Sequence, residues 1–122
     1  MNVRIPILLV FSACLALAAD VAGTWVFHMD TPNGEVQADL TLQVDGSKVT
    51  GTVLFPEDRK FTVENGVWDG KELKFTVRRN RSQGDTIVYE LKATLDGSKL
   101  KGSTETKLDG HSATQEWWAQ RK

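Results

Sequence analysis

Beyond residue 20, apolar and polar residues alternate with a period of two through most of the chain. The alternation is clearest over 86–95, where Ile87, Tyr89, Leu91 and Ala93 are separated by single, mostly polar residues. Such a pattern places one set of side chains in a core and the other in water, which is typical of antiparallel strands. No stretch after residue 20 keeps a helical periodicity, so the pattern predicts an all-β domain.

Asp-Gly and Asn-Gly pairs separate the alternating segments. Asp-Gly occurs at 45–46, 69–70, 96–97 and 109–110, and Asn-Gly occurs at 33–34 and 65–66. These pairs suit hairpin turns, because both central residues adopt a positive φ at low cost. Short strands joined by such turns are typical of a sandwich or a barrel.

The segments between the turns give eight expected strands. They lie near 23–29, 36–44, 48–55, 60–68, 71–79, 86–95, 99–107 and 112–121. Because most links are short, consecutive strands are expected to pair as a meander, and closure hides the apolar face and the edges. The sequence therefore predicts an eight-stranded antiparallel up-and-down barrel, with an open sandwich as the alternative. The interior of such a barrel is filled by side chains or holds one small ligand.

The first nineteen residues differ from the rest of the chain. Arg4 supplies a positive charge, residues 5–17 are almost wholly apolar, and Ala18 and Ala19 are small residues suited to cleavage. This pattern is that of a secretory signal peptide, and the apolar run is too short to span a bilayer comfortably. We therefore expect a signal peptide over 1–19 and one mature domain over 20–122, without a transmembrane segment. The expected location is periplasmic or extracellular, and an uncleaved anchor is the alternative.

Cys14 is the single cysteine and lies within the apolar run. Cleavage after residue 18 or 19 would remove it, which leaves the mature domain without a disulfide or a cysteine-bound metal. The alternative is a bacterial lipoprotein, in which residues 11–14 form the lipid-attachment box and Cys14 carries the anchor. The net charge of −1 argues against nucleic acid as the main partner, because phosphate binding needs a concentrated basic surface.

The two ends of the mature chain carry motifs of one known class of barrel. Gly23-Thr24-Trp25 opens the first expected strand, and Trp117-Trp118-Ala119-Gln120-Arg121 closes the last. This pairing resembles the lipocalin-like (calycin) barrels, including short exported bacterial domains of that type. The resemblance implies that Arg121 packs across the indole of Trp25 at a closed end of the barrel. The chain lacks the disulfide and C-terminal helix of larger lipocalins, and it lacks the set of biotin-binding residues found in avidin-like barrels.

The chain offers no recognisable catalytic constellation. His28 and His111 are the only histidines, and neither lies in a pattern with a serine nucleophile and an acid. By parity His28 is expected on the outer face, and His111 follows a turn, so both are expected to be solvated. The sequence therefore predicts no catalytic residue, no metal site and no cofactor, and the chain is interpreted as a non-enzymatic protein.

Arg79 and Tyr89 are the candidate ligand-binding residues. Both have inward parity, so Arg79 could meet an acidic ligand group at the barrel mouth and Tyr89 could offer its hydroxyl. For Arg79 the alternative is a solvated, charged hairpin tip that it forms with Arg78 and Arg81. The alternative is a packed interior, because the inward aromatic residues are bulky enough to fill a small barrel.

Trp118 and Trp68 are the candidate surface-interaction residues. Strand parity directs both indoles outward, and exposed aromatic side chains often mark a partner surface. For Trp68 the alternative is that a bulge at Asn65-Gly66 reverses the parity and buries the ring. Two functions follow. The first is a binding module that holds a small apolar or amphipathic ligand in the barrel; the second is a filled barrel that acts on a protein partner, for example as an inhibitor, through its outer surface.

Overall fold

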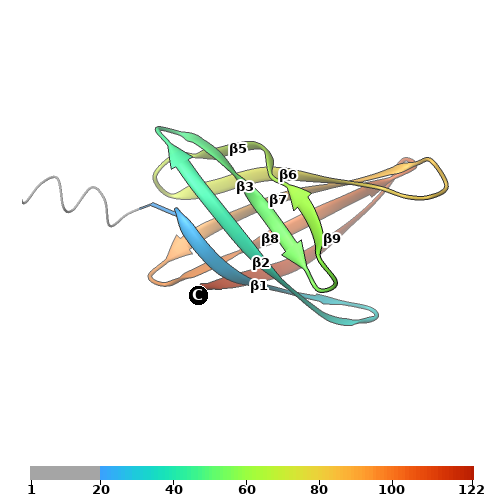
Figure 1. Cartoon of the computed structure of the whole chain (residues 1–122), viewed down its shortest axis with the longest axis horizontal. Helices are drawn as coiled ribbons and strands as arrows, with labels where there is room; N and C mark the ends of the chain where they lie inside the picture. The colour runs from blue at the N-terminus through green and yellow to red at the C-terminus, as the bar shows by residue number, and fades with distance from the viewer. Residues whose placement is uncertain (1–19) are drawn as a thin grey trace, which may run out of the picture.

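A computed structural model describes residues 20–122 as nine β-strands (Figure 1). The strands are β1 (Gly23–Thr31), β2 (Gly34–Asp45), β3 (Lys48–Phe55), β4 (Arg59–Thr62), β5 (Glu64–Trp68), β6 (Glu72–Asn80), β7 (Thr86–Asp96), β8 (Lys99–Leu108) and β9 (His111–Arg121). The predicted signal peptide over 1–19 and the alternative lipid anchor at Cys14 lie outside the described residues. Residues 20–122 contain no helix long and apolar enough to cross a membrane.

The strands form one closed antiparallel sheet. Its order is β2-β1-β9-β8-β7-β6-β5-β3-β4, and an additional pairing of β2 with β3 closes the ring. β4 and β5 both pair with β3, so together they occupy the place of the single strand expected at 60–68. The predicted eight-stranded antiparallel meander barrel is therefore confirmed, and the open sandwich is excluded.

A bulge in β5 decides the position of Trp68. Asn65 has a φ of 53°, and the register between β5 and β6 shifts between Glu64 and Val67. A Cβ at Gly66 would lie 2.4 Å from the carbonyl oxygen of Val49, so only glycine fits at this close approach. The shift turns the Trp68 ring inward, where it is 6% exposed. The outward orientation of Trp68 is therefore wrong, and the bulge alternative describes the structure.

Most predicted glycine pairs lie at hairpin turns, but Asn65-Gly66 lies inside β5, and the central residues of several turns differ from the predicted pairs. At Asp109-Gly110 both central residues have a positive φ, as the sequence predicts. In the β2–β3 and β7–β8 turns, however, the aspartate is the last strand residue and the central pair is Gly-Ser, in which only Gly46 or Gly97 has a positive φ. A single glycine at the first central position is the requirement of a type II′ turn, which also matches the strand twist.

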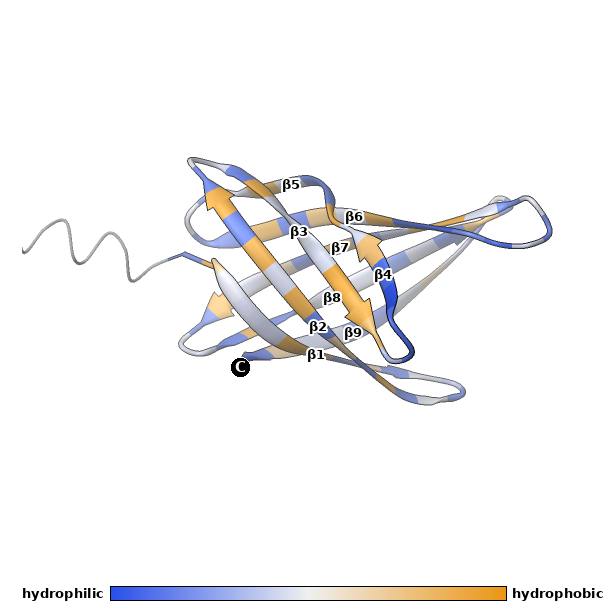
Figure 2. Cartoon of the chain, viewed as in Figure 1, coloured by the Kyte–Doolittle hydropathy of each residue, from blue (hydrophilic) through white to orange (hydrophobic). Residues whose placement is uncertain are grey.

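The alternation of side chains builds a continuous core inside the barrel. Apolar and polar residues alternate along β2 and its neighbours in Figure 2. Leu40, Leu73 and Leu100, from three different strands, are fully buried at the centre. Gly102 lies opposite Trp117, and a Cβ there would meet the carbonyl oxygen of Lys92 at 1.7 Å. Only glycine allows this close approach of β8 to β7 beside the large indole of Trp117.

One end of the barrel is sealed by Trp25 and Arg121. Trp25 is fully buried, and its Nε1 donates a hydrogen bond of 3.0 Å to the carbonyl oxygen of Val21. Arg121 lies opposite Trp25 on β9, with its guanidinium carbon 4.4 Å from the centre of the indole. The same guanidinium donates hydrogen bonds of 2.7 Å to the carbonyl oxygens of Ala22 and Asp20. This arrangement is the one implied by the resemblance to lipocalin-like barrels.

Candidate functional site

The opposite end of the barrel is open. The pairing of β9 with β1 stops at Met29 and Trp117, and the pairing of β5 with β6 stops at Glu64 and Thr76. Beyond these points β6 to β9 continue as paired strands, and their hairpins extend on the right in Figure 1. The barrel wall is therefore interrupted on two sides near this end, which gives access to the interior.

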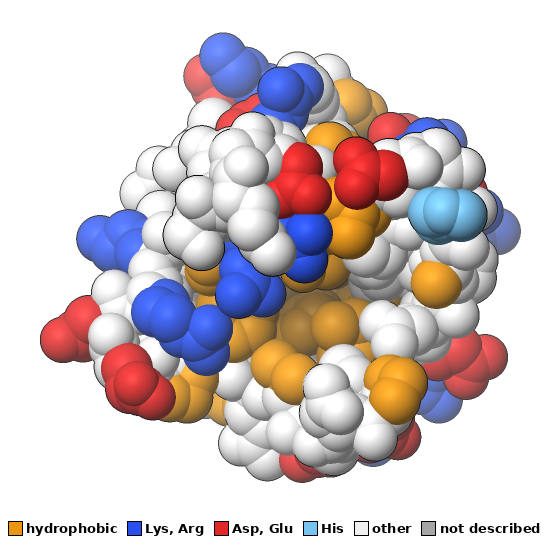
Figure 3. Space-filling model, turned by 90° about the vertical axis from the view of Figure 1, so that its right-hand side faces the viewer, with side chains coloured by type: hydrophobic (Ala, Val, Ile, Leu, Met, Phe, Trp, Pro, Cys, Tyr) orange, Lys and Arg blue, Asp and Glu red, His pale blue; other side chains and the backbone are white. Residues whose placement is uncertain are grey.

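A cavity of about 380 Å³ begins at this open end. Figure 3 looks into the opening and shows apolar side chains at the bottom of the hollow, with basic side chains beside them and acidic side chains at the upper edge of the opening. The lining residues are mostly apolar or aromatic and come from all strands except β5: Phe27, Met29, Thr31, Asn33, Val36, Leu40, Val53, Phe55, Arg59, Phe61, Phe75, Val77, Arg79, Tyr89, Leu91, Thr104, Thr106 and Gln115.

Aromatic side chains form the floor and part of the wall of this cavity. Trp117 lies below it, with its ring centre 5.0 Å from that of Phe27 and 6.2 Å from that of Phe75. Phe55 and Phe61 meet edge to face at 5.6 Å on the wall. The aromatics therefore line the cavity of the open half without filling it, so the interior is not completely packed.

The polar groups of the lining lie mainly on one wall. Tyr89 is opposite Thr106, and one layer deeper Leu91 is opposite Thr104, which in turn is opposite Gln115. Thr104 is 1% exposed, and its hydroxyl has no hydrogen-bond partner among the described residues. The facing wall, built by β1 to β4, is apolar below its rim. The cavity thus has an apolar side and a side that offers hydroxyl and amide groups.

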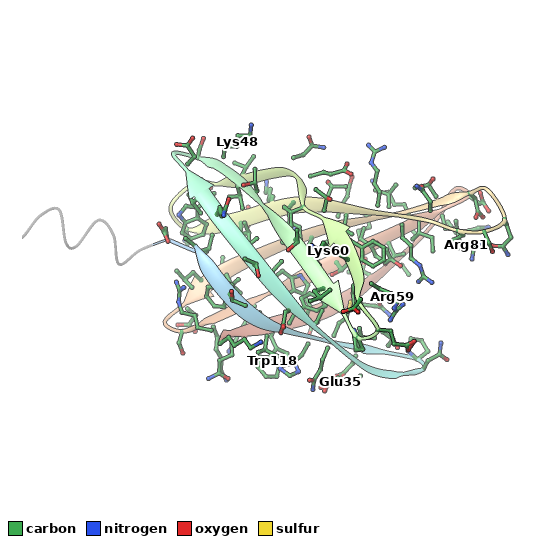
Figure 4. The ribbon with its side chains drawn as sticks, viewed as in Figure 1. Glu35, Lys48, Arg59, Lys60, Arg81 and Trp118 are labelled. Carbon is green, nitrogen blue, oxygen red and sulfur yellow. The ribbon has the colours of Figure 1, made fainter. Side chains whose placement is uncertain are left out.

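The structure brings the two predicted ligand-binding residues to this cavity. Arg79 lies exposed at the rim on β6, and Tyr89 lies half-buried on β7, opposite Val77 and one layer deeper. Arg59, which was not among the predicted site residues, also lines the cavity and is labelled at the open end in Figure 4. Its parity with Phe61 along β4 was the available signal.

Arg59 and Arg79 differ from the other arginines near this end. Arg78 points outward and pairs with Glu64 at 3.1 Å. Arg81 makes a two-fold contact with Asp85, at 2.7 and 3.0 Å. The hydrogen bond from Arg81 lowers the pKa of Asp85 and, reciprocally, raises that of Arg81. Within residues 20–122, neither Arg59 nor Arg79 has a carboxylate within salt-bridge distance.

Trp118 lies on the outer face of the barrel, as predicted. Its ring is 37% exposed, stacks on His28 with ring centres 4.0 Å apart, and has the Lys99 ammonium 5.4 Å from its centre. His28 lies on the predicted outer face but is not freely solvated, since its side chain is only 16% exposed and Nδ1 is 3.6 Å from a Glu35 oxygen. The pKa of Glu35 is lowered, first by a hydrogen bond from Gln37 and then by His28. The Trp118 ring covers His28 on the outer face. Strand parity predicts the outward direction of His28 but not this cover.

The described part of the chain holds no group of three or more His, Cys, Asp or Glu side chains able to bind a metal ion. His111 is exposed at the start of β9. The candidate site is described by its shape, its apolar surface and two arginines without a carboxylate partner among residues 20–122.

The fold and the cavity together define the class of protein: a closed antiparallel β-barrel with an apolar cavity open at one end. The chain is similar to a solved structure described as EF1p2_mFAP2b bound to DFHBI, with a TM-score of 0.58 and 17% sequence identity, over 88% of this chain and 96% of that one. At this identity the likeness shows the fold alone. No protein-family model and no curated protein matches the chain, so the lipocalin-like resemblance stays a prediction.

Proposed function

We propose that this protein binds a small apolar or amphipathic molecule inside the open half of its barrel. The observation that carries the proposal is the cavity of about 380 Å³ lined mainly by apolar and aromatic side chains. Such a surface is costly to leave in water, and a ligand that covers it gains roughly 25 cal/mol for each Å² of apolar area removed from water. The volume lies in the range of about 300–1,000 Å³ that is usual for small-molecule sites.

The comparison supports this proposal at the level of the fold. A barrel of similar architecture has been solved with DFHBI bound. The sealed end also supports the proposed binding function, because Trp25 and Trp117 supply a packed base that keeps the barrel folded while its other half stays open.

Binding of the neutral fluorescent probe N-phenyl-1-naphthylamine tests the proposal. Thr106 points into the cavity beside Tyr89, so Thr106→Trp would place an indole in the ligand volume. We expect this variant to lose at least about tenfold in affinity, which is about 1.4 kcal/mol. Thr114→Trp adds the same ring to the exposed outer face of β9 and serves as the matched control. Equal affinity of both variants and the original protein would exclude the cavity as the binding site.

We further propose that the protein is exported, that it is lipocalin-like and that it acts without catalysis. Export is supported by the charged, apolar and small-residue pattern of residues 1–19. The intact mass of the exported product tests it, because cleavage after residue 18 or 19 leaves an unmodified mature chain. A mass that includes Cys14 with acyl groups would instead show the lipid-anchored form.

A second candidate function uses the outer face. Trp118 is held in place by stacking on His28, and it borders a shallow groove whose basic residues are Lys92, Lys99 and Lys101. Figure 4 shows Trp118 beside Glu35 on the outside of the barrel. An ordered, exposed indole is typical of protein-contact surfaces, so a protein-interaction role is proposed for this face.

A further inference from the structure

We propose that the natural ligand is an anionic amphiphile, whose acidic group is bound by Arg59 and Arg79 at the mouth while its apolar body lies in the cavity. This inference rests on the proposed function and adds the chemical class of the ligand. The class includes molecules with one carboxylate, sulfonate or sulfate group attached to an aliphatic or aromatic body.

The first argument is the charge of the lining. Among the described residues that line the cavity, Arg59 and Arg79 are the only charged ones, and no aspartate or glutamate faces the same space. Glu57 and Asp58 precede Arg59 in the β3–β4 loop, but neither lines the cavity or pairs with it. A cationic ligand head would therefore meet two like charges, and an anionic head would meet two opposite ones.

The second argument is that these two guanidinium groups have donors to spare. Arg59 uses Nε for a hydrogen bond of 3.3 Å to the carbonyl oxygen of Pro56, and its guanidinium carbon is 5.5 Å from the centre of the Phe55 ring. These contacts fix its side chain against the cavity wall. Its Nη groups, and the whole guanidinium of Arg79, make no hydrogen bond within residues 20–122. A planar guanidinium with free donors matches the geometry of a carboxylate or sulfonate.

The third argument is where the two arginines lie. Arg59 is the first residue of β4. Arg79 lies at the end of β6, next to the turn, and in phase with Phe75 and Val77. β4 and β6 contact each other, but they are not hydrogen-bonded neighbours in the sheet. The arginines thus occupy the rim above the apolar floor. An acid held there leaves the body of the molecule to enter the barrel.

The fourth argument is the polar wall below the rim. The hydroxyls of Tyr89, Thr104 and Thr106 lie on β7 and β8, and the Thr104 hydroxyl is buried without a partner. A pure hydrocarbon would leave such groups without hydrogen bonds, which is unfavourable. An amphiphile with a polar edge or substituent suits this wall better than a plain alkane does.

A matched pair of fluorescent probes tests the inference. The anion 8-anilinonaphthalene-1-sulfonate and neutral N-phenyl-1-naphthylamine share one aromatic body and differ by the sulfonate. Exposed charge pairs are screened, so each arginine is expected to contribute about three- to fivefold in affinity and both together about tenfold. We therefore expect the double variant Arg59→Gln/Arg79→Gln to bind the sulfonate about tenfold more weakly and the neutral probe within about twofold of the original protein.

Arg78→Gln is the matched control. It removes one positive charge, against two in the double variant, from the position next to Arg79 on β6, and the Arg78 side chain faces outward to Glu64. We expect it to leave both affinities within about twofold. As a measurement without substitution, the sulfonate affinity of the original protein should fall from low salt to about 0.5 M sodium chloride, whereas the neutral probe's affinity should not.

The outcomes separate the two proposals. If the neutral probe binds in the cavity but the double variant keeps its sulfonate affinity, the anionic class is wrong and the binding function stands. An equal loss of sulfonate affinity in Arg78→Gln would also overturn the anionic class, since the net charge of the protein, rather than the two arginines at the rim, would then be responsible. If neither probe binds the original protein, the proposed function fails and the inference fails with it.

Discussion

Arginine side chains have different surroundings at the two ends of this barrel. At the sealed end, the Arg121 guanidinium lies over the Trp25 ring and donates to two backbone carbonyl oxygens. At the open end, Arg59 and Arg79 line an apolar cavity without a carboxylate partner among the described residues. The comparison indicates that an arginine's surroundings, rather than its presence at a barrel end, distinguish the structural role of Arg121 from the binding role that we propose for Arg59 and Arg79.

The same contrast holds for the aromatic residues. Trp25 and Trp117 are buried, and each donates its indole N–H to a backbone carbonyl oxygen. Phe55 and Phe61 instead face the cavity and remain partly exposed. Substitutions at the sealed end should therefore change the free energy of unfolding, whereas substitutions at the open end should change ligand affinity.

Trp25→Ala should produce the largest effect on stability. Removing a fully buried indole leaves a void and takes away the ring that Arg121 covers. We expect the free energy of unfolding to fall by about 3–5 kcal/mol, as for other large aromatic truncations. Urea denaturation followed by circular dichroism measures it. A loss below about 1 kcal/mol would show that the sealed end does not hold the barrel together.

Arg121→Ala and Arg79→Ala compare the two ends directly. The first removes two hydrogen bonds to backbone carbonyl oxygens, so we expect a loss of about 1–2 kcal/mol. The second removes an exposed side chain without such bonds, so we expect a change within about 0.5 kcal/mol. The urea midpoints of the two variants provide the measurement. Equal losses would remove the distinction between the ends.

Trp118→Ala sharpens the comparison between the cavity and the outer face. The substitution removes the stack with His28, and we expect a loss of about 1 kcal/mol in unfolding free energy. The affinity for N-phenyl-1-naphthylamine should stay within about twofold, because Trp118 does not line the cavity. A large loss of probe binding in a fluorescence titration would instead place the site on the outer face.

The smallest expected effects concern pH. Two backbone N–H groups, those of Glu72 and Lys71, lower the pKa of Asp69 in the β5–β6 turn at the sealed end. A lowered pKa in the folded state contributes stability above the ordinary value of 3.8, and this contribution is lost as the pH falls through the folded-state pKa.

Asp69→Asn should therefore be slightly less stable than the original protein at neutral pH, and the difference should vanish in strong acid. Asp85→Asn should behave in the same way at the open end, because Arg81 lowers the pKa of Asp85. Urea midpoints measured over a series of pH values test both. A difference that grows as the pH falls would contradict the assignment.

Much of the fold could be predicted because its signals are local. Period-two alternation fixes which side chains face the core, and glycine pairs mark the turns. The seal was predictable from its two motifs, since Trp25 and Arg121 lie directly opposite each other on β1 and β9. Inward parity also predicted that Arg79 and Tyr89 face the interior, and both line the cavity.

The missed features depend on contacts or irregularities that parity does not describe. The bulge at Asn65 reverses the orientation of Trp68, and a cross-strand stack covers His28. Arg59 directly follows a loop, and β4 spans only Arg59–Thr62. The alternation there is too short to show clearly that the Arg59 side chain faces inward. The volume left between the aromatics depends on how they pack, which composition alone does not determine.

The central claim is that a ligand occupies the open half of the barrel. The most direct measurement is a ¹H–¹⁵N correlation spectrum recorded during titration with N-phenyl-1-naphthylamine. We expect the largest shifts at amides around the cavity, including Val77, Tyr89 and Thr106, with little change at Leu100 in the sealed half. Shifts confined to the outer face around Trp118, or no saturable shifts, would contradict the claim.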